Sequence, residues 1–256
     1  MSSFFRQAFD ALKEANLVLV VIDSRFPQMM RVSDMENWLK RKKIPFILVL
    51  NKMDLLMGKK PDVKDWLSEE IPIVLVSALP KRNIIRLRSL IFSMLKDGGN
   101  VAVVGYPNAG KSSLINALAG RHAAPTSKQA GFTRGRSRIR LREGIYLFDT
   151  PGVIPLNEND SFQLMLMNAR SPNQLRDIES LAMQLLEWLP SQEIWSDWLQ
   201  RTYGFSPKGG KDGDEQLAEL AIHWRKIRKG GIPDLHTAAI KLVLDWQGGS
   251  KKSRIV

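Results

Sequence analysis

The sequence contains no cysteine and only three histidines. The absence of cysteine excludes disulfide bonds, thiol catalysis and cysteine zinc sites, and three scattered histidines are too few to indicate a metal cluster. No apolar run approaches the roughly 18–20 residues that span a bilayer, and the longest, such as residues 17–22, have the length of buried strands. Residues 1–15 resemble an amphipathic helix and lack the apolar region and cleavage site of a signal peptide. We therefore expect a cytoplasmic monomer with neither a membrane nor a disulfide-bonded partner.

The charge is distributed unequally along the chain. The formal net charge is +12, from 38 basic and 26 acidic residues in a chain of 256. Residues 157–256 contain 13 basic and 13 acidic side chains, so the whole excess lies in residues 1–156. A basic domain favours a polyanionic partner, most simply a nucleic acid. The alternative is surface charge that serves solubility alone.

The apolar runs predict a layered α/β domain in residues 1–156. Runs rich in Val, Ile and Leu alternate with helix-like segments, which is the pattern of a parallel sheet covered on both faces. Two further strands, at residues 137–141 and 145–148, are joined by a turn at Glu143-Gly144 and complete a six-stranded, mostly parallel sheet. The four apolar runs lie at residues 17–22, 45–50, 73–76 and 101–104, and the helix-like segments at 32–43, 62–69 and 83–96.

Residues 157–256 predict a second, all-α domain. The strand pattern fades there, and the tryptophans of this part are expected to fill a helical core. A loop is expected at residues 208–213, and residues 248–256 have the composition of a basic tail. The expected helices lie near residues 172–189, 191–202, 213–229 and 233–247.

A phosphate-binding loop is predicted between the strand at 101–104 and the helical run that follows it. The pattern is Gly105-x4-Gly110-Lys111-Ser112, in which glycines let the backbone wrap phosphates and amide groups at a helix N-terminus supply positive dipoles. Lys111 would place its ammonium between the β- and γ-phosphates, and Ser112 would ligate magnesium. The expected nucleotide contacts of this loop are Asn108, Ala109, Gly110, Lys111, Ser112 and Ser113.

Three further positions are expected to sense the γ-phosphate. Asp149 ends the strand at 145–148, where its carboxylate can hold magnesium through water. The amide of Gly152 can swing to meet the γ-phosphate. Thr133 lies in a glycine-rich stretch, and its hydroxyl would complete the magnesium shell when GTP is present. Thr126 is the alternative for that role, and Thr133 is then an exposed loop residue.

A guanine site is predicted at the ends of two neighbouring strands. Asn51-Lys52-x-Asp54 follows one strand and Ser77-Ala78 ends the next. The carboxylate of Asp54 can accept both N1–H and N2–H of guanine and would repel the edge of adenine, which disfavours a plain ATPase. Lys52 can pack its stem over the base, Asn51 can tie the two loops together, and a backbone N–H of Ser77-Ala78 can meet guanine O6.

The guanine motifs precede the phosphate motifs, which reverses the order of an ordinary Ras-like domain. In this order, and in Asp23-Ser24-Arg25-Phe26-Pro27 and Arg228-Lys-Gly-Gly-Ile-Pro-Asp234, the chain resembles the circularly permuted GTPases of the YlqF/RbgA type, which assist ribosome assembly. The resemblance covers most of the chain. It implies a circularly permuted Ras-like P-loop GTPase domain followed by a helical RNA-contacting domain. It also implies GTP or GDP, magnesium and potassium as ligands, and rRNA in a ribosomal subunit precursor, by resemblance the large one, as partner.

The resemblance further implies how catalysis is assisted. Asn108 occupies the position of an asparagine that coordinates potassium, an ion that supplies positive charge where other GTPases use an arginine finger. A loop residue tolerated for its backbone angles is the alternative. Val153 stands where Ras-type enzymes have a water-orienting glutamine, and no histidine precedes His122, although family members often carry one near the N-terminus. With Lys111, Thr133, Gly152 and Asn108 as catalytic groups, we expect slow intrinsic hydrolysis that ribosomal particles and potassium stimulate.

Two basic clusters are candidate RNA contacts. Arginines recur at every second position of a predicted strand, which would place their guanidinium groups on one face roughly 6.6–6.8 Å apart, close to the phosphate spacing of a nucleic-acid strand. The alternative is an edge strand protected from aggregation by charge. The second cluster would contact rRNA phosphates or form a solvated helix end. The strand arginines are Arg134, Arg136, Arg138, Arg140 and Arg142, and the second cluster is Arg225, Lys226, Arg228 and Lys229.

Together these features predict a GTP-hydrolysing ribosome-assembly factor that binds rRNA in a nucleotide-dependent way. The rival hypothesis is a non-hydrolysing RNA-binding scaffold that uses guanine nucleotide as a structural ligand. The segment after Gly152 leads within a few residues into the helical domain, so nucleotide state could set how RNA is held.

Overall fold

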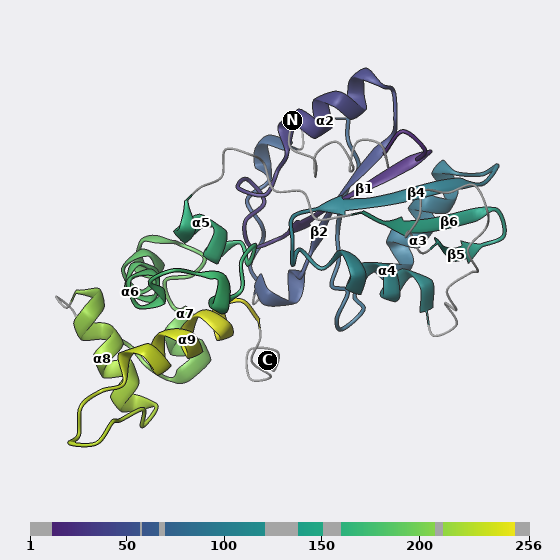
Figure 1. The fold of residues 1–256 in the computed structure, drawn as a ribbon. Helices are drawn as coiled ribbons and strands as arrows, with labels where there is room; N and C mark the ends of the chain where they lie inside the picture. The colour runs from purple at the N-terminus through teal and green to yellow at the C-terminus, as the bar shows by residue number, and fades with distance from the viewer. Residues whose placement is uncertain are drawn as a thin grey trace. The chain divides into compact units, whose positions relative to one another are not determined.

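The structure is a computed structural model that describes residues 12–56, 58–66, 70–120, 138–150, 160–207 and 212–248. The chain divides into two compact units, Met1–Glu158 and Asn159–Val256. The division falls two residues beyond the boundary expected from the sequence. Figure 1 shows that the first unit is built around a sheet and the second from helices alone.

The first unit contains a six-stranded sheet with the strand order β3-β2-β1-β4-β6-β5. All neighbouring strands are parallel except β5 and β6, which are antiparallel. Its central strands are buried along their whole length because they consist of aliphatic residues that pack on both faces. The expected fold class is thereby confirmed. The strands are β1 (Leu17–Asp23), β2 (Phe46–Asn51), β3 (Ile73–Leu75), β4 (Gly99–Gly105), β5 (Arg138–Arg142) and β6 (Ile145–Asp149).

Helices cover both faces of this sheet. In Figure 1, α2 lies on one side of the sheet, and α3 and α4 lie on the other. α2 is amphipathic and buries Met35 and Leu39, as its apolar spacing predicts. The segment expected to be helical at 62–69 contains, in its described part, only a 3-10 turn. The helices are α2 (Ser33–Arg41), α3 (Ile84–Met94) and α4 (Lys111–Ala119), with 3-10 turns η1 (Met53–Leu56) and η2 (Lys64–Trp66).

The row of strand arginines is less regular than the sequence predicts. A register shift between Arg140 and Arg142 interrupts the alternation of side chains in β5. Arg138 donates to the side chain of Asn100 at 2.7 Å, and its guanidinium lies over the ring of Tyr146. Arg142 stacks on Phe92 with 4.5 Å between its Cζ and the ring centroid. These contacts engage two of the three described arginines within the chain, and Arg134 and Arg136 lie outside the described residues, so a row of five arginines on one face stays a prediction.

The second unit is a bundle of helices packed around tryptophans. Trp246 lies at its centre and makes edge-to-face contacts with Trp188, Trp195 and Trp198. Trp195, Trp198 and Trp246 are buried as expected, whereas Trp188 and Trp224 are only half-buried. Within the described ranges no helix is long and apolar enough to cross a bilayer. The helices are α5 (Ser161–Leu166), α6 (Ile178–Trp188), α7 (Trp198–Tyr203), α8 (Gly213–His223) and α9 (Leu235–Trp246), with 3-10 turns η4 (Pro172–Gln174) and η5 (Leu189–Ser191).

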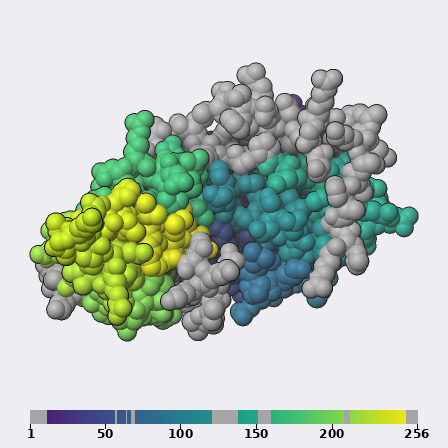
Figure 2. Space-filling model, turned by 60° about the horizontal axis from the view of Figure 1, so that its bottom comes forward, coloured from purple at the N-terminus to yellow at the C-terminus, as the bar shows by residue number. Residues whose placement is uncertain are grey.

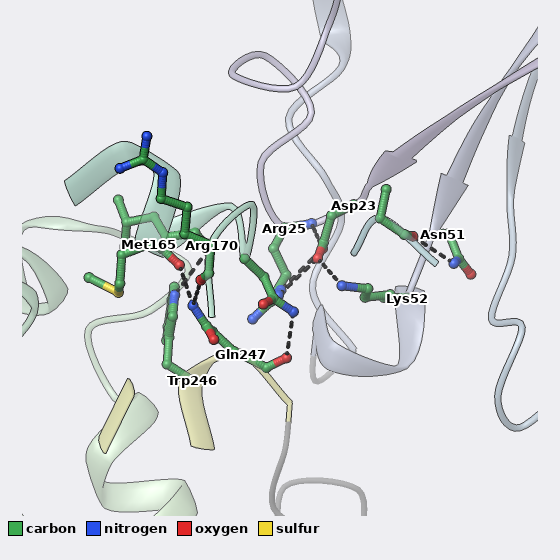
Figure 3. A network of polar contacts seen from close by, with 11 residues as sticks. Asp23, Arg25, Asn51, Lys52, Met165, Arg170, Trp246 and Gln247 are labelled. Carbon is green, nitrogen blue, oxygen red and sulfur yellow. Dashed lines mark hydrogen bonds and ion pairs between the residues drawn. The ribbon is translucent and has the colours of Figure 1, made fainter. Parts of the chain in front are cut away.

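Aspartates begin most of these helices. Each accepts hydrogen bonds from backbone N–H groups in the first turn, groups that have no partner within the helix. The side chain of Gln247, the residue after α9, donates to the carbonyls of Met165 and Arg170 and fixes the end of that helix (Figure 3). The capping residues are Asp160, Asp177, Asp212 and Asp234.

The second basic cluster lies in a loop and not on a helix. α8 ends at His223, and Arg225 adopts a left-handed backbone conformation with φ of +55°, which ends the helix earlier than expected. The chain then folds back on itself, with an antiparallel bridge between Ile227 and Pro233. Figure 2 shows the segment around α9, in yellow, on the open surface of the helical unit. The expected helix at 213–229 is therefore too long by six residues.

Candidate nucleotide-binding site

The predicted motifs meet at one edge of the sheet. Asp23 at the end of β1 is in register with Asn51 at the end of β2, and Val21 is in register with Gly105 at the end of β4. Because these strands are parallel, the loops that follow them leave the sheet on the same side. Ligands of open α/β sheets bind at this carboxyl edge.

The loop from Gly105 to Gly110 joins β4 to α4 and requires glycine at both ends. Gly105 has φ of +147°, and a Cβ there would lie 2.2 Å from the carbonyl oxygen of Val21. Gly110 caps α4 with φ of +96°, and a Cβ there would lie 2.3 Å from Nδ2 of Asn51. The loop is thus held against both neighbouring strands, and Gly110 lies directly against the predicted guanine motif.

Lys111 is the first residue of α4 and is largely buried. Its Nζ donates hydrogen bonds to the carbonyls of Gly105 at 3.2 Å and Tyr106 at 2.8 Å. Burial lowers the pKa of Lys111, and the carboxylate of Asp149 opposes that shift. The ammonium of Lys111 is therefore poorly solvated, and an anionic phosphate bound in the loop would be a stronger partner for it than these two carbonyls are.

Ser112 and Asp149, the two predicted magnesium ligands in the described part of the chain, lie together. Oγ of Ser112 donates to Oδ2 of Asp149 at 3.0 Å. A hydroxyl and a carboxylate are hard oxygen donors of the kind magnesium prefers, so the pair fits this ion. Among the described residues no group of three or more acidic, histidine or cysteine side chains could hold a metal unaided. Magnesium at this pair would therefore need further oxygens, which nucleotide phosphates and water can provide.

Asn51 connects the guanine motifs to the phosphate loop. Its Nδ2 donates to the carbonyl of Ala109 at 3.0 Å, and its Oδ1 accepts from the amide of Ala78 at 3.0 Å. Asn51 is buried, so both bonds are shielded from water. One side chain thus fixes the distance between segments that are 58 residues apart in sequence.

Asp54 is held in place through its backbone and has a free acceptor. Its amide donates to Oγ of Ser77 at 3.0 Å. Its Oδ1 is buried and accepts no hydrogen bond. A buried acceptor without a donor is costly, and a base that offers N–H groups would satisfy it.

The backbone amides of Ser77 and Ala78 are engaged within the chain. The amide of Ser77 donates to the carbonyl of Arg82 at 3.1 Å, and that of Ala78 donates to Asn51. In this structure neither amide is open to guanine O6, which differs from the expectation. The pair instead positions Asp54 and Asn51.

Lys52 makes a contact that the sequence did not predict. Its Nζ lies 2.8 Å from Oδ2 of Asp23, and Arg25 forms a two-pronged hydrogen-bonded pair with the same carboxylate (Figure 3). Burial by itself raises the pKa of Asp23, but the charges of Arg25 and Lys52 more than offset this and hold it well below its usual range. Asp23 and Arg25 belong to the segment at 23–27 that resembles the motif of the YlqF/RbgA family. This segment begins at the end of β1, next to β2, and that position could have indicated from the sequence that both residues lie beside Lys52.

The remaining predicted residues differ in what the structure describes. Asn108 is exposed and has φ of +58°, a left-handed conformation that asparagine tolerates well, so backbone geometry alone can explain it. Ser113 lies in the first turn of α4, and Ala109 is buried in the loop. The predicted residues outside the described ranges are Thr126, Thr133, Arg134, Arg136, Gly152 and Val153.

Comparisons with known proteins agree with this arrangement. The sequence model of the 50S ribosome-binding GTPase family matches residues 100–203. The chain is 33% identical over 245 residues to an uncharacterized GTP-binding protein of Methanocaldococcus jannaschii, covering 93% of this chain and 63% of that protein. It is 31% identical over 255 residues to nuclear/nucleolar GTPase 2 of Arabidopsis thaliana, covering 95% of this chain and 43% of that protein. The chain therefore spans about half the length of these curated relatives.

Solved structures share the fold along nearly the whole chain. YlqF from T. maritima bound to GNP superposes with a TM-score of 0.66, covering 97% of this chain and 94% of that chain at 21% identity. The GDP-bound form of YlqF superposes with the same TM-score of 0.66 at 22% identity. The fold expected from the order of the motifs is thereby confirmed.

Proposed function

We propose that the chain is a circularly permuted GTPase that binds GTP and hydrolyses it to GDP and phosphate; its similarity to GTP-binding proteins and its YlqF-like fold support this. One observation carries the proposal. Asn51 fixes the guanine motif against the phosphate loop through two buried hydrogen bonds, and beside it Oδ1 of Asp54 is a buried acceptor without a donor. Guanine offers two adjacent N–H groups on one edge, whereas adenine offers an unprotonated N1 there.

The phosphates would lie along the loop that precedes α4. Its amides and Lys111 would hold the β- and γ-phosphates, and Ser112 with Asp149 would hold magnesium. Magnesium, when bound, would neutralise charge that develops on the phosphates. Thr133 and the amide of Gly152 are proposed to complete the contacts to the γ-phosphate, and Asn108, an exposed residue of the loop, to hold potassium.

We also propose that intrinsic hydrolysis is slow. Val153 follows Gly152 in the sequence, and an aliphatic side chain cannot orient a water molecule by hydrogen bonding. Potassium and a ribosomal particle would stimulate hydrolysis by supplying the catalytic contribution that Val153 cannot make. The matching family model carries the words "50S ribosome-binding", which supports a large-subunit precursor as the particle.

Contact with rRNA is proposed for two basic surfaces. Arg140 in β5 is exposed, and Arg138 and Arg142 lie beside it. In the helical unit, the loop that contains Arg225, Lys226, Arg228 and Lys229 is largely exposed. The excess positive charge of residues 1–156 supports a nucleic-acid partner for the first surface.

We propose, as expected from the sequence, that the protein is a monomer that acts in the cytoplasm. The Arabidopsis relative is named nuclear/nucleolar, which is a different compartment. Imaging of the tagged full chain in its own cells would decide between the two compartments.

The test of the proposed function is turnover of GTP with and without potassium and pre-ribosomal particles. We expect a slow basal rate that both additions raise. Tight guanine-nucleotide binding with no turnover under any of these conditions would favour the alternative, a non-hydrolysing RNA-binding scaffold. Crosslinking to rRNA in the presence of a GTP analogue and of GDP would test whether binding depends on the nucleotide.

A further inference from the structure

Three charged side chains, Asp23, Arg25 and Lys52, form a compact and largely buried group at the predicted guanine site. Asp23 is fully buried, and Arg25 is nearly so. Oδ1 of Asp23 accepts from Nε and from the backbone amide of Arg25, both at 3.1 Å. Oδ2 lies 2.8 Å from both Nη2 of Arg25 and Nζ of Lys52. One carboxylate thus holds two cations, and all of its oxygens are engaged.

Lys52 has two carboxylates within electrostatic range. Asp23 forms the close contact, while Asp54, two residues further along the chain, acts on the same ammonium without a hydrogen bond to it. Burial lowers the pKa of Lys52, Asp23 opposes this, Arg25 adds to it, and Asp54 has the weakest effect. The ammonium is thus committed to Asp23, and Oδ1 of Asp54 is left without a partner.

The arrangement solves a problem inherent in this motif. A lysine and an aspartate two residues apart attract each other, and an ion pair between them would occupy the acceptor that must recognise the base. The carboxylate of Asp23, in direct contact with the Lys52 ammonium, prevents this ion pair. Arg25 keeps that anion in place, because its two-pronged geometry fixes the carboxylate and its own position over Phe26 is fixed at 5.4 Å from Cζ to the ring centroid.

We propose that Asp23 is a positioning residue for base specificity: it holds the Lys52 ammonium away from Asp54 and so keeps the carboxylate of Asp54 out of an ion pair, as an acceptor for the N–H groups of guanine. The proposal rests on the proposed function, since it concerns the same pocket. It assigns to the first strand of this permuted domain a part in base recognition.

The test is the ratio of GDP to IDP affinity, measured by competition at equilibrium in Asp23→Asn. IDP keeps O6 and N1–H of GDP but lacks the 2-amino group, so the ratio reports directly on Asp54. The wild-type protein should favour GDP by about 10-fold or more, the value of one hydrogen bond to a charged group. In Asp23→Asn the ratio should fall toward one, and GDP affinity should fall about 10- to 100-fold.

Glu36→Gln is the matched control. Glu36 lies on α2 of the same unit, is also buried and forms a two-pronged pair with Arg31, whose Nε donates to Oε1 at 3.1 Å and whose Nη2 donates to Oε2 at 2.8 Å. The Glu36→Gln substitution removes the same charge from a comparable ion pair that does not contact Lys52. The control should destabilise the fold to a similar degree and leave the GDP:IDP ratio unchanged.

A double-mutant cycle with Lys52→Met completes the test. Without an ammonium there is nothing for Asp23 to hold, so Asp23→Asn should not change the ratio further in that background. Equal effects of Asp23→Asn in both backgrounds would overturn the proposal, as would an unchanged ratio in the wild-type background. If Asp23→Asn does not fold, Asp23→Glu keeps the charge but displaces the carboxylate, and a smaller fall in the ratio is expected; an unchanged ratio would again overturn the proposal.

The same measurements distinguish failure of the proposed function from failure of the positioning role of Asp23. If the unmodified protein binds neither GDP nor IDP, the proposed function fails and this inference fails with it. If the unmodified protein prefers GDP and Asp23→Asn keeps that preference, only the positioning role of Asp23 is wrong.

Discussion

The side chain of Asn51 donates a hydrogen bond of 3.0 Å to the backbone carbonyl of Ala109, two residues before Lys111. This bond joins the guanine motif to the phosphate loop, although the permuted order separates them along the chain. If the site binds a guanine nucleotide as proposed, the base and the phosphates would be recognised by segments whose distance depends on one buried amide. Several consequences can be measured.

Asn51→Ala should uncouple the two halves of the pocket. It leaves the buried amide of Ala78 and carbonyl of Ala109 without their partners, so we expect a loss of about 2–4 kcal/mol in the free energy of unfolding. Nucleotide affinity should fall as well. Urea unfolding with and without GDP measures both effects. Asn37→Ala, an exposed site on α2, is the control, and equal losses in the two variants would contradict the bridging role.

Asp54→Asn should change the preferred base from guanine to xanthine. A carboxamide donates where the carboxylate accepts, and xanthine has a carbonyl oxygen in place of the 2-amino group of guanine. We expect GDP affinity to fall about 100-fold and XDP to become the better ligand. Competition between GDP and XDP measures the change. A variant that binds both nucleotides as the wild type does would remove Asp54 from the base site.

Ser112→Ala should abolish the magnesium dependence of GTP-analogue binding. The hydroxyl lies 3.0 Å from Asp149, and without it the proposed site loses one of its two protein oxygens. Magnesium titrations of analogue affinity measure this. Ser113→Ala is the comparison, because it should weaken the analogue equally at low and high magnesium. The same magnesium response in Ser112→Ala and wild type would rule out this pair as the metal site.

Tyr203→Phe should reduce the alkaline sensitivity of the helical unit. Burial, followed by the hydrogen bond of 2.7 Å to Asp245, raises the pKa of Tyr203 above its ordinary value of 10.0. A group whose pKa is raised by folding contributes stability that is complete below pH 10 and declines as the pH rises further, because the unfolded chain then loses its proton first.

The measurement is the free energy of unfolding of both proteins between pH 8 and 11, in about half-unit steps. The wild type should lose stability above pH 10 more steeply than Tyr203→Phe. Lys241, which also pairs with Asp245, is present in both proteins, so the difference between them belongs to Tyr203. Parallel curves would show that the buried phenol does not contribute in this way.

Arg140→Gln should weaken RNA binding and lower its salt dependence. Arg140 and Arg142 are both exposed, but Arg142 stacks on Phe92 and Arg138 donates to Asn100, so Arg140 is the arginine tested. Loss of one phosphate contact should reduce the slope of log affinity against log salt by about one. Arg41→Gln removes the same charge from an exposed position on α2 and should leave the slope unchanged. Identical slopes in both variants would favour protection of the sheet edge as the role of these arginines.

The sheet and its motifs could be predicted from the sequence because each follows from local patterns. The buried residues Val101–Val104 of β4 form a continuous aliphatic run. The loop after β4 needs glycine at both ends because Val21 and Asn51 lie too close for a Cβ there. Parallel strands bring their carboxyl ends together, so the order of motifs was enough to predict that Asn51 and Gly105 lie at one edge of the sheet.

The parts that sequence patterns missed depend on long-range packing. The pairing of Lys52 with Asp23 links two strand ends that are adjacent only in the folded sheet. The bulge in β5 and the early end of α8 at His223 follow from contacts and backbone angles that residue spacing does not carry. The engagement of the Ser77 and Ala78 amides likewise becomes visible only when Arg82 and Asn51 are placed beside them.

Equilibrium competition between GDP and ADP for the unmodified protein, in magnesium and potassium, tests the central claim most directly. The account predicts that GDP binds and that ADP at the same concentration does not displace it, because only guanine can donate to the buried oxygen of Asp54. Equal affinities for the two nucleotides would contradict it.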